Sequence, residues 1–133
     1  AEFHKVAQPI GVVVTDTMGR AWRLGLTDNA IGVAGVTTLL DYRGQKDAAG
    51  RTLEQSITAV ADEIASTAEL VKGKLDQIPV VLVRGLAQYV TLADGDGARS
   101  IVRPPEEDLF GLGAEMAERR GYLRGFEDGK NER

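Results

Sequence analysis

"TLEQSITAVADEIASTAELVKG", residues 52–73, is the stretch that most clearly predicts an element of the fold. Thr52 and Gln55 have the spacing of a capping box, which favours a helix start at Thr52. Apolar side chains then recur at helical spacing, at Ile57, Val60, Ala61, Ile64, Ala65, Ala68 and Val71. Gly73 is a typical residue at a helix end. We therefore predict a long amphipathic helix that packs on a sheet.

Three segments on either side of this helix predict strands. Residues 9–15 (PIGVVVT) place three valines between glycine and polar residues, as in a buried strand. Residues 28–36 mix β-branched side chains with glycines that permit close approach of another backbone. Residues 79–85 (PVVLVRG) are a second candidate for a buried strand. This order predicts the α+β class, with a mixed or antiparallel sheet packed by the helix.

The remaining segments predict connections and a terminal helix. Residues 16–23 and 41–51 are polar and glycine-containing, which is typical of loops, and residues 94–97 (DGDG) indicate a loop or hairpin tip. Residues 104–108 (PPEED) open a final helix with acidic residues at its positive end, and we expect it to run to about Gly121 or beyond. The length predicts a single domain over residues 1–133, with a frayed tail at 122–133.

Composition excludes several classes of protein. Hydrophobic residues make up 43% of the 133 residues and charged residues 27%, as in ordinary globular domains. The net charge is −4 with no basic stripe, so we expect no nucleic-acid partner. The absence of cysteine excludes disulfides and thiolate metal sites. No apolar run approaches the ~20 residues that span a bilayer, and the first residues lack a signal-peptide core. We expect a cytoplasmic protein without membrane contact.

Thr15, Asp16 and Thr17 are the first candidate for chemistry, because they follow a predicted strand directly. A carboxylate beside hydroxyls suits a hard cation such as Mg²⁺ or Mn²⁺. Arg20 and Arg23 can supply charge-assisted bonds to a phosphate or to a substrate carboxylate. The alternative is a surface turn in which Asp16 caps the loop backbone, and spacing alone favours this alternative.

Lys72, Gly73 and Lys74 are the second candidate. Lysines at a helix C-terminus interact favourably with the helix dipole, and this structural account is the more common one. The functional account is a basic clamp on nucleotide phosphates, although no P-loop motif occurs.

Other polar residues have one favoured interpretation each. Neighbours on a helix point in different directions, so we expect Asp62 and Glu63 to be solvated. Asp41 and Asp47 are turn caps more often than ligands. We expect His4, the only histidine, at the surface. The residue Trp22 can stack on a planar ligand or anchor the core, and both alternatives stay open.

Residues 11–23 (GVVVTDTMGRAWR) resemble the signature of the coenzyme F420 gamma-glutamyl ligases. Further segments that are similar to this family follow in the same order, at residues 25–35, 41–44, 59–65, 79–86 and 103–110. The resemblance covers about residues 10–112, and several ordered motifs make it more specific than any one of them.

The resemblance implies a GTP-dependent ligase with the gamma-glutamyl ligase fold. Its reaction adds L-glutamate through gamma-linked amide bonds to coenzyme F420-0 by way of an acyl phosphate. The implied cofactors are two divalent ions, Mg²⁺ or Mn²⁺, with a monovalent cation as a further option. By resemblance, Asp16 binds the first divalent ion and Thr17 the second, and residues 72–74 contact the nucleotide. Lys74 departs from the Gln or Glu expected as a ligand there. The implied assembly is a homodimer, and no catalytic residue is assigned.

The main departure from the family is length, since its members are longer at the amino-terminal side. We therefore expect this chain to be the carboxy-terminal half, and its activity alone to be doubtful. Two alternatives stay open beside the ligase: a non-catalytic nucleotide- or metal-binding module, and a dimerisation domain.

Overall fold

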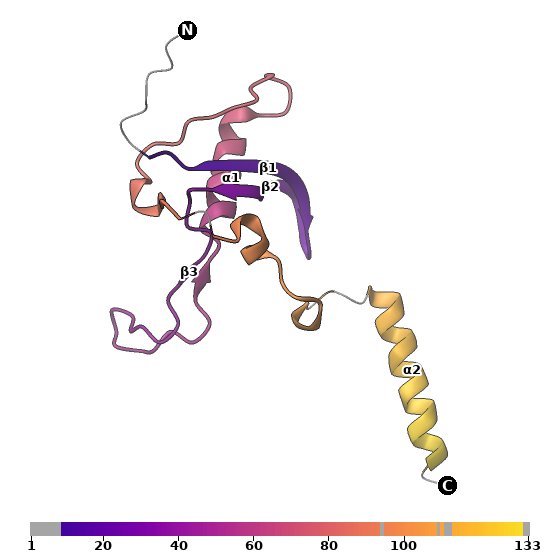
Figure 1. The fold of residues 1–133 in the computed structure, drawn as a ribbon. Helices are drawn as coiled ribbons and strands as arrows, with labels where there is room; N and C mark the ends of the chain where they lie inside the picture. Colours follow the sequence, from indigo (N-terminus) through magenta and orange to yellow (C-terminus); the bar gives the residue numbers. More distant parts are fainter. Residues whose placement is uncertain (1–8, 94, 109, 111–112, 132–133) are drawn as a thin grey trace. The chain divides into compact units, whose positions relative to one another are not determined.

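The computed structural model describes residues 9–93, 95–108, 110 and 113–131 (Figure 1). The chain divides into two compact units, Ala1–Val102 and Arg103–Arg133, and each is described by itself. The first unit contains the sheets, the helix α1 and two short 3₁₀ helices. The second unit contains one 3₁₀ helix and the helix α2. The expected single domain stays a prediction.

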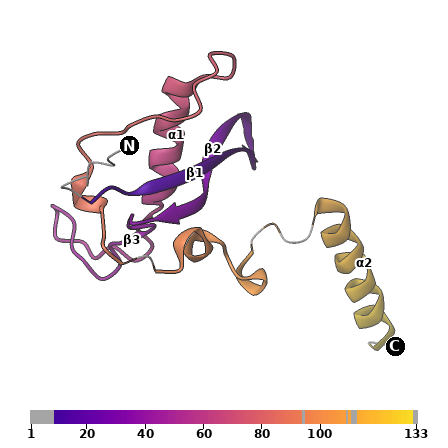
Figure 2. The ribbon, with the colours of Figure 1, turned by 45° about the horizontal axis from the view of Figure 1, so that its top comes forward.

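A long β-hairpin forms the centre of the first unit. The strands β1 (Val12–Arg20) and β2 (Arg23–Ala34) pair antiparallel, and a bulge interrupts their register between Val14 and Thr15. Two residues, Ala21 and Trp22, connect the strands, with Trp22 at a positive φ of 62°. The helix α1 (Val60–Lys72) lies across one face of this hairpin, as Figures 1 and 2 both show. An antiparallel sheet packed by a helix confirms the predicted α+β class.

The two faces of the hairpin differ in an unusual way. Thr15 and Thr17 point to the helix side and are half-buried, whereas Val12 and Val14 point outward and are 53% and 54% exposed. Side chains of a strand alternate between its faces, so Val12 and Val14 share the outward face, whereas Val13 is half-buried on the same side as the two hydroxyls. The face against α1 is therefore partly polar.

The predicted helix start is wrong. Residues 52–58 belong to a second hairpin, in which β3 (Leu40–Asp41) pairs with β4 (Ile57–Thr58) and Lys46 bridges to Thr52. The backbone of this segment bonds across the hairpin, as from Leu53 N to Gln45 O at 2.8 Å, and is not available for a helical turn. The predicted helix end is confirmed, since the Gly73 N–H donates to Glu69 O at 3.0 Å.

Two further sequence predictions are wrong. Residues 16–20 continue the strand β1, because they pair with β2 up to the hairpin turn. Residues 79–85 form no strand, and Val80 and Leu82 are exposed. A run of valines needs a neighbouring strand to form a ladder, and this segment has none among the described residues.

Short helical segments and the helix α2 complete the chain. The 3₁₀ helices are η1 (Ala87–Tyr89), η2 (Gly97–Ile101) and η3 (Pro105–Glu107), and α2 spans Ala114–Asn131. The final helix was predicted to start at residue 104, but the structure has only the single turn η3 there, and α2 starts at Ala114. Residues 122–131, where we expected a frayed tail, lie in α2. No helix in the described part of the chain is long and apolar enough to cross a membrane.

Candidate functional site

Asp28 forms the centre of the polar cluster between the hairpin and α1. It lies in β2, is 2% exposed, and is the one buried charged residue among those described. The Thr15 hydroxyl donates to Asp28 Oδ2 at 2.8 Å, and the Thr17 hydroxyl donates to Asp28 Oδ1 at 2.9 Å. Antiparallel pairing brings these side chains together, because Thr17 lies directly opposite Asp28. Each carboxylate oxygen therefore has its own hydroxyl donor.

Two lysines from the end of α1 complete this arrangement. Lys72 Nζ donates to Asp28 Oδ2 at 2.5 Å and to Thr15 Oγ1 at 2.7 Å. Lys74 Nζ donates to Thr17 Oγ1 at 2.7 Å and lies 3.4 Å from Asp28 Oδ1. Two hydroxyls and two ammonium groups thus surround one carboxylate, and we call Asp28, Thr15, Thr17, Lys72 and Lys74 the Asp28 cluster.

Glu69 of α1 joins the Asp28 cluster to the backbone of β2. Its Oε1 lies 2.6 Å from Lys74 Nζ, and its Oε2 accepts the Asp28 N–H at 2.7 Å. The Ser66 hydroxyl donates to Asp28 O at 3.0 Å, and Asp62 Oδ1 accepts the Ala30 N–H at 2.8 Å. Asp62 is therefore not the solvated residue that we predicted, because it binds a backbone group of β2. Side chains of α1 supply the hydrogen bonds that hold this part of the hairpin against the helix.

Hydrogen bonds in the cluster favour its charged forms. The hydrogen bond from Lys72 holds the pKa of Asp28 well below its usual range, although burial opposes this effect, and the Thr15 and Thr17 hydroxyls lower it further. The hydrogen bond from Lys74 lowers the pKa of Glu69, and the same bond raises the pKa of Lys74. These shifts favour Asp28 and Glu69 as carboxylates and Lys74 as an ammonium, and Lys72 forms an ion pair with Asp28.

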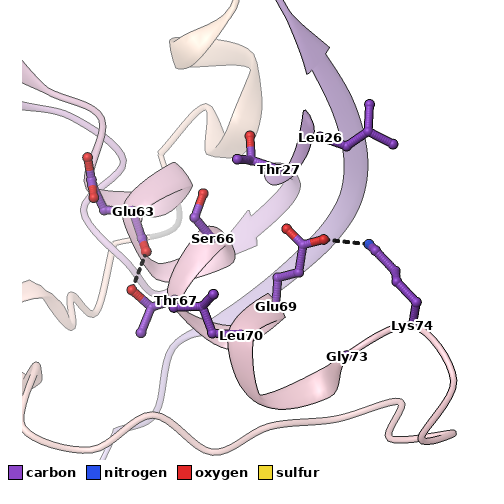
Figure 3. Close-up of a pocket in the computed structure, with 9 residues that line it drawn as sticks. All are labelled: Leu26, Thr27, Glu63, Ser66, Thr67, Glu69, Leu70, Gly73 and Lys74. Atoms are coloured by element: carbon purple, nitrogen blue, oxygen red, sulfur yellow. Dashed lines mark hydrogen bonds and ion pairs between the residues drawn. The ribbon is translucent and has the colours of Figure 1, made fainter. Parts of the chain in front are cut away.

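A pocket of about 510 Å³ lies beside the cluster, between β2 and the C-terminal half of α1 (Figure 3). Its lining combines the carboxylates of Glu63 and Glu69 and the ammonium of Lys74 with apolar side chains such as Leu26 and Leu70. The Glu69–Lys74 ion pair lies on its wall, so these two residues belong both to the pocket and to the environment of Asp28.

The structure separates the residues that the sequence grouped as a metal site. Thr17 points to the helix side and joins the Asp28 cluster, whereas Asp16 lies on the exposed face, where its Oδ1 accepts the Thr17 N–H at 2.8 Å. No group of three or more His, Cys, Asp or Glu side chains that could hold a metal ion occurs in the part of the chain that is described. The ligand roles of Asp16 and Thr17 stay a prediction.

Arg20 and Arg23 face each other across the turn of the hairpin, and both are exposed. Arg20 lies three residues beyond Thr17, which is about 10 Å along a strand, and Arg23 pairs with Arg20, so both are outside the Asp28 cluster. Trp22 lies between them and is 91% exposed, which excludes its interpretation as a core anchor.

The other predicted candidates have structural roles or lie elsewhere. The Asp41 carboxylate accepts the backbone N–H and the guanidinium of Arg43. Asp47 accepts the backbone N–H groups of Ala49 and Arg51, and both patterns confirm turn capping. His4 lies outside the described residues.

Sequence reasoning missed Asp28, the centre of the cluster, and Glu69, which joins the cluster to the backbone of β2. The sequence pattern placed Asp28 at the start of a predicted strand and gave Glu69 no role. The available signal was the pattern Thr15-x-Thr17, which places two hydroxyls on one face of a strand. The partner of these hydroxyls could not be read from it, because Asp28 lies 13 and 11 residues away in the sequence.

Comparison with known proteins decides the family. A family model described as F420-0:Gamma-glutamyl ligase matches residues 3–85, which include both strands of the hairpin and α1. The chain belongs to the F420-0:gamma-glutamyl ligase family. The resemblance seen in the sequence is thereby confirmed.

Curated relatives at 41–45% identity carry the name coenzyme F420:L-glutamate ligase. The chain is 45% identical over 102 residues to the coenzyme F420:L-glutamate ligase of Methanocaldococcus jannaschii. The aligned region covers 76% of this chain and 40% of that protein. It is 44% identical over 107 residues to the coenzyme F420:L-glutamate ligase of Methanopyrus kandleri, covering 79% and 42%. The protein of this name from Methanothermobacter thermautotrophicus is 41% identical over 102 residues, covering 76% and 40%. The chain thus spans about 40% of the length of these gamma-glutamyl ligase relatives.

Proposed function

We propose that this chain is part of a ligase that joins L-glutamate to coenzyme F420-0 through gamma-linked amide bonds. The observation that carries the proposal is the 45% identity to a protein named coenzyme F420:L-glutamate ligase. The chain covers less than half of that relative, so the proposed activity belongs to a longer parent protein.

In the proposed reaction, GTP transfers its terminal phosphoryl group to the acceptor carboxylate of coenzyme F420-0, which yields GDP and an acyl phosphate. The amine of L-glutamate then attacks the acyl carbon, the amide bond forms, and inorganic phosphate leaves with the electrons of the broken C–O bond. Phosphoryl transfer of this kind depends on positioning and on offsetting phosphate charge. Divalent ions, Mg²⁺ or Mn²⁺, would offset part of that charge when bound.

The residues 72–74 have the properties of a phosphate-binding segment. Lys74 is 56% exposed and carries an ammonium whose charged form Glu69 supports. Lys72 is held by Asp28 and is 20% exposed. Gly73 between them has φ 57°, which turns the chain so that both ammonium groups reach one carboxylate. We propose that Lys74 is the phosphate contact and that Lys72 orients it through their shared carboxylate.

Arg20 and Arg23 are proposed to contact a phosphate or substrate carboxylate from the tip of the hairpin. Both are exposed and lie in register with each other, and guanidinium pairs are suited to bidentate binding of such groups.

The proposed partner in assembly is a second copy of the protein. The outward face of the hairpin carries the exposed side chains of Val12, Val14 and Met18. An exposed apolar patch on a protein surface often marks a site of interaction with another protein. This observation also supports the alternative, in which the chain acts only as a dimerisation or nucleotide-binding module.

The proposal is tested with the full-length parent, GTP, L-glutamate and coenzyme F420-0, followed by mass spectrometry and GDP release. We expect one GDP for each glutamate added, and we expect Asp16→Asn to abolish addition while the circular dichroism spectrum is kept. Asp96→Asn is the matched control, since Asp96 is exposed and lies outside the Asp28 cluster. Glutamate addition by Asp16→Asn at the wild-type rate would refute the role of Asp16, and no addition by the wild type would refute the ligase.

A further inference from the structure

The ammonium of Lys74 lies among three oxygens that come from three different elements. Glu69 Oε1 of α1 is 2.6 Å away, Thr17 Oγ1 of β1 is 2.7 Å away, and Asp28 Oδ1 of β2 is 3.4 Å away. Two carboxylates and a hydroxyl are the donor types that hard divalent cations prefer. The surroundings of Lys74 therefore have the composition of a cation site, with an ammonium as the cation.

The second ammonium occupies the other side of the same carboxylate. Lys72 Nζ contacts Asp28 Oδ2 and Thr15 Oγ1, as Lys74 contacts Asp28 Oδ1 and Thr17 Oγ1. The carboxylate of Asp28 thus bridges two cations, and each cation also has its own threonine. Both cations belong to the polypeptide.

We infer that Lys74 is a built-in cation that fills an oxygen-lined site in this chain and keeps divalent ions out of it. This inference goes beyond the proposed ligase reaction and does not rest on it. It also differs from what the family resemblance implies for Thr17, because the hydroxyl of Thr17 is bound to Lys74 and not to a second divalent ion.

The balance of charge explains why a divalent ion is excluded. Asp28 and Glu69 together carry two negative charges, and Lys72 and Lys74 together carry two positive charges. With both lysines in place, a divalent ion beside Asp28, which is 2% exposed, would leave two uncompensated positive charges next to a buried group, and this is costly. Loss of the Lys74 charge removes one of these two charges. The ion can enter only if the Lys74 ammonium leaves its three oxygens.

Removal of the Lys74 charge should therefore create a divalent site. In Lys74→Gln, the oxygens of Glu69, Thr17 and Asp28 lose their ammonium, and the new amide adds a further oxygen donor. We expect Lys74→Gln to bind Mn²⁺ at least about tenfold more tightly than the wild type, since affinity follows the number and charge of the ligands. Lys46→Gln is the control, because it removes the same charge from an exposed lysine of another hairpin.

The measurement is a titration of the 133-residue chain with Mn²⁺ alone, followed by electron paramagnetic resonance of the free ion. Paramagnetic broadening of backbone amide signals locates the bound ion. The wild type and Lys46→Gln should show no preferential broadening at Thr17 and Asp28, and Lys74→Gln should show it there with one ion per chain. Adding Thr17→Val to Lys74→Gln should weaken this binding.

Two results would overturn the inference. The first is that the wild-type chain binds one Mn²⁺ and the ion broadens the backbone amide signals of Thr17 and Asp28. The other is a folded Lys74→Gln chain, with the wild-type circular dichroism spectrum, that gains no Mn²⁺ affinity. Because the titration contains neither nucleotide nor coenzyme F420-0, its outcome is independent of the proposed ligase activity.

Discussion

At the scale of single residues, the main feature is the carboxylate of Asp28, which accepts hydrogen bonds from two hydroxyls and two ammonium groups. Burial alone would favour its neutral form, and the donors reverse that preference. A buried ion in such a setting stabilises the fold only while its partners are present, because a remaining unpaired charge is costly. Asp28 and Lys72 are therefore coupled to the stability of the hairpin–helix contact.

We predict that Asp28→Asn lowers the free energy of unfolding by roughly 2–4 kcal/mol, because Lys72 and Lys74 lose their shared counterion. The effect should depend on pH. The folded pKa of Asp28 lies below its unfolded value of about 3.9. Its ionised form therefore stabilises the fold above that value, and this stability is lost as the pH falls through the folded pKa.

Urea unfolding followed by circular dichroism at several pH values measures this effect. Below about pH 4 the wild type should lose stability more steeply than Asp28→Asn, which has no group to titrate at this position. Asp96→Asn, at an exposed position, should keep the wild-type slope. Equal slopes for the wild type and Asp28→Asn would contradict the pairing of Asp28 as an ion.

The residues of the site differ in how far the sequence could predict them. Thr17 and Lys72 to Lys74 were singled out from local motifs, and the structure brings their side chains together. Asp28 was missed, because its contact with Lys72 joins residues 44 positions apart in the sequence. Hydrophobic periodicity describes neighbours along the chain, and a polar contact between a strand and a helix end leaves no such pattern.

At the scale of elements, the end of α1 positions the Asp28 cluster. Gly73 has φ 57° and ψ −169°, a region that essentially only glycine occupies. The helix can therefore stop directly after Lys72 and return Lys74 toward the hairpin. The sequence predicted this end but not the start of α1, because the capping-box spacing at Thr52 is local whereas residues 52–58 pair with residues 40–46.

We predict that Gly73→Ala destabilises the chain by about 1–3 kcal/mol, since alanine is strained in this backbone region. A Cβ at residue 73 would also lie 2.5 Å from Asp76 Oδ2, so that side chain would have to move. Gly121→Ala in α2 is the control, because a Cβ there meets nothing within 4 Å. Thermal unfolding measures both variants, and a Gly73→Ala chain as stable as Gly121→Ala would contradict this role of Gly73.

At the scale of the whole molecule, the main feature is that the described residues include few buried apolar side chains. Val60, Ala61 and Ala65 are the buried hydrophobic residues among them, whereas Val12 and Val14 face outward. The three consecutive valines of β1 were predicted to form a buried strand, but two of them face outward, and Thr15 and Thr17 of the polar cluster lie on the face against α1. An outward apolar face fits the proposed homodimer, and the chain spans about 40% of its curated relatives.

The central claim is that this chain carries the phosphate-binding part of a nucleotide site, with Lys74 as its exposed cation. Calorimetric titration of the chain with GDP, on the wild type, Lys74→Gln and Lys46→Gln, tests this claim most directly. We predict that the wild type and Lys46→Gln bind GDP equally and that Lys74→Gln binds at least about tenfold more weakly, as expected for one lost charge-assisted contact. Absence of GDP binding to the wild type, or equal affinity in all three chains, would contradict the claim.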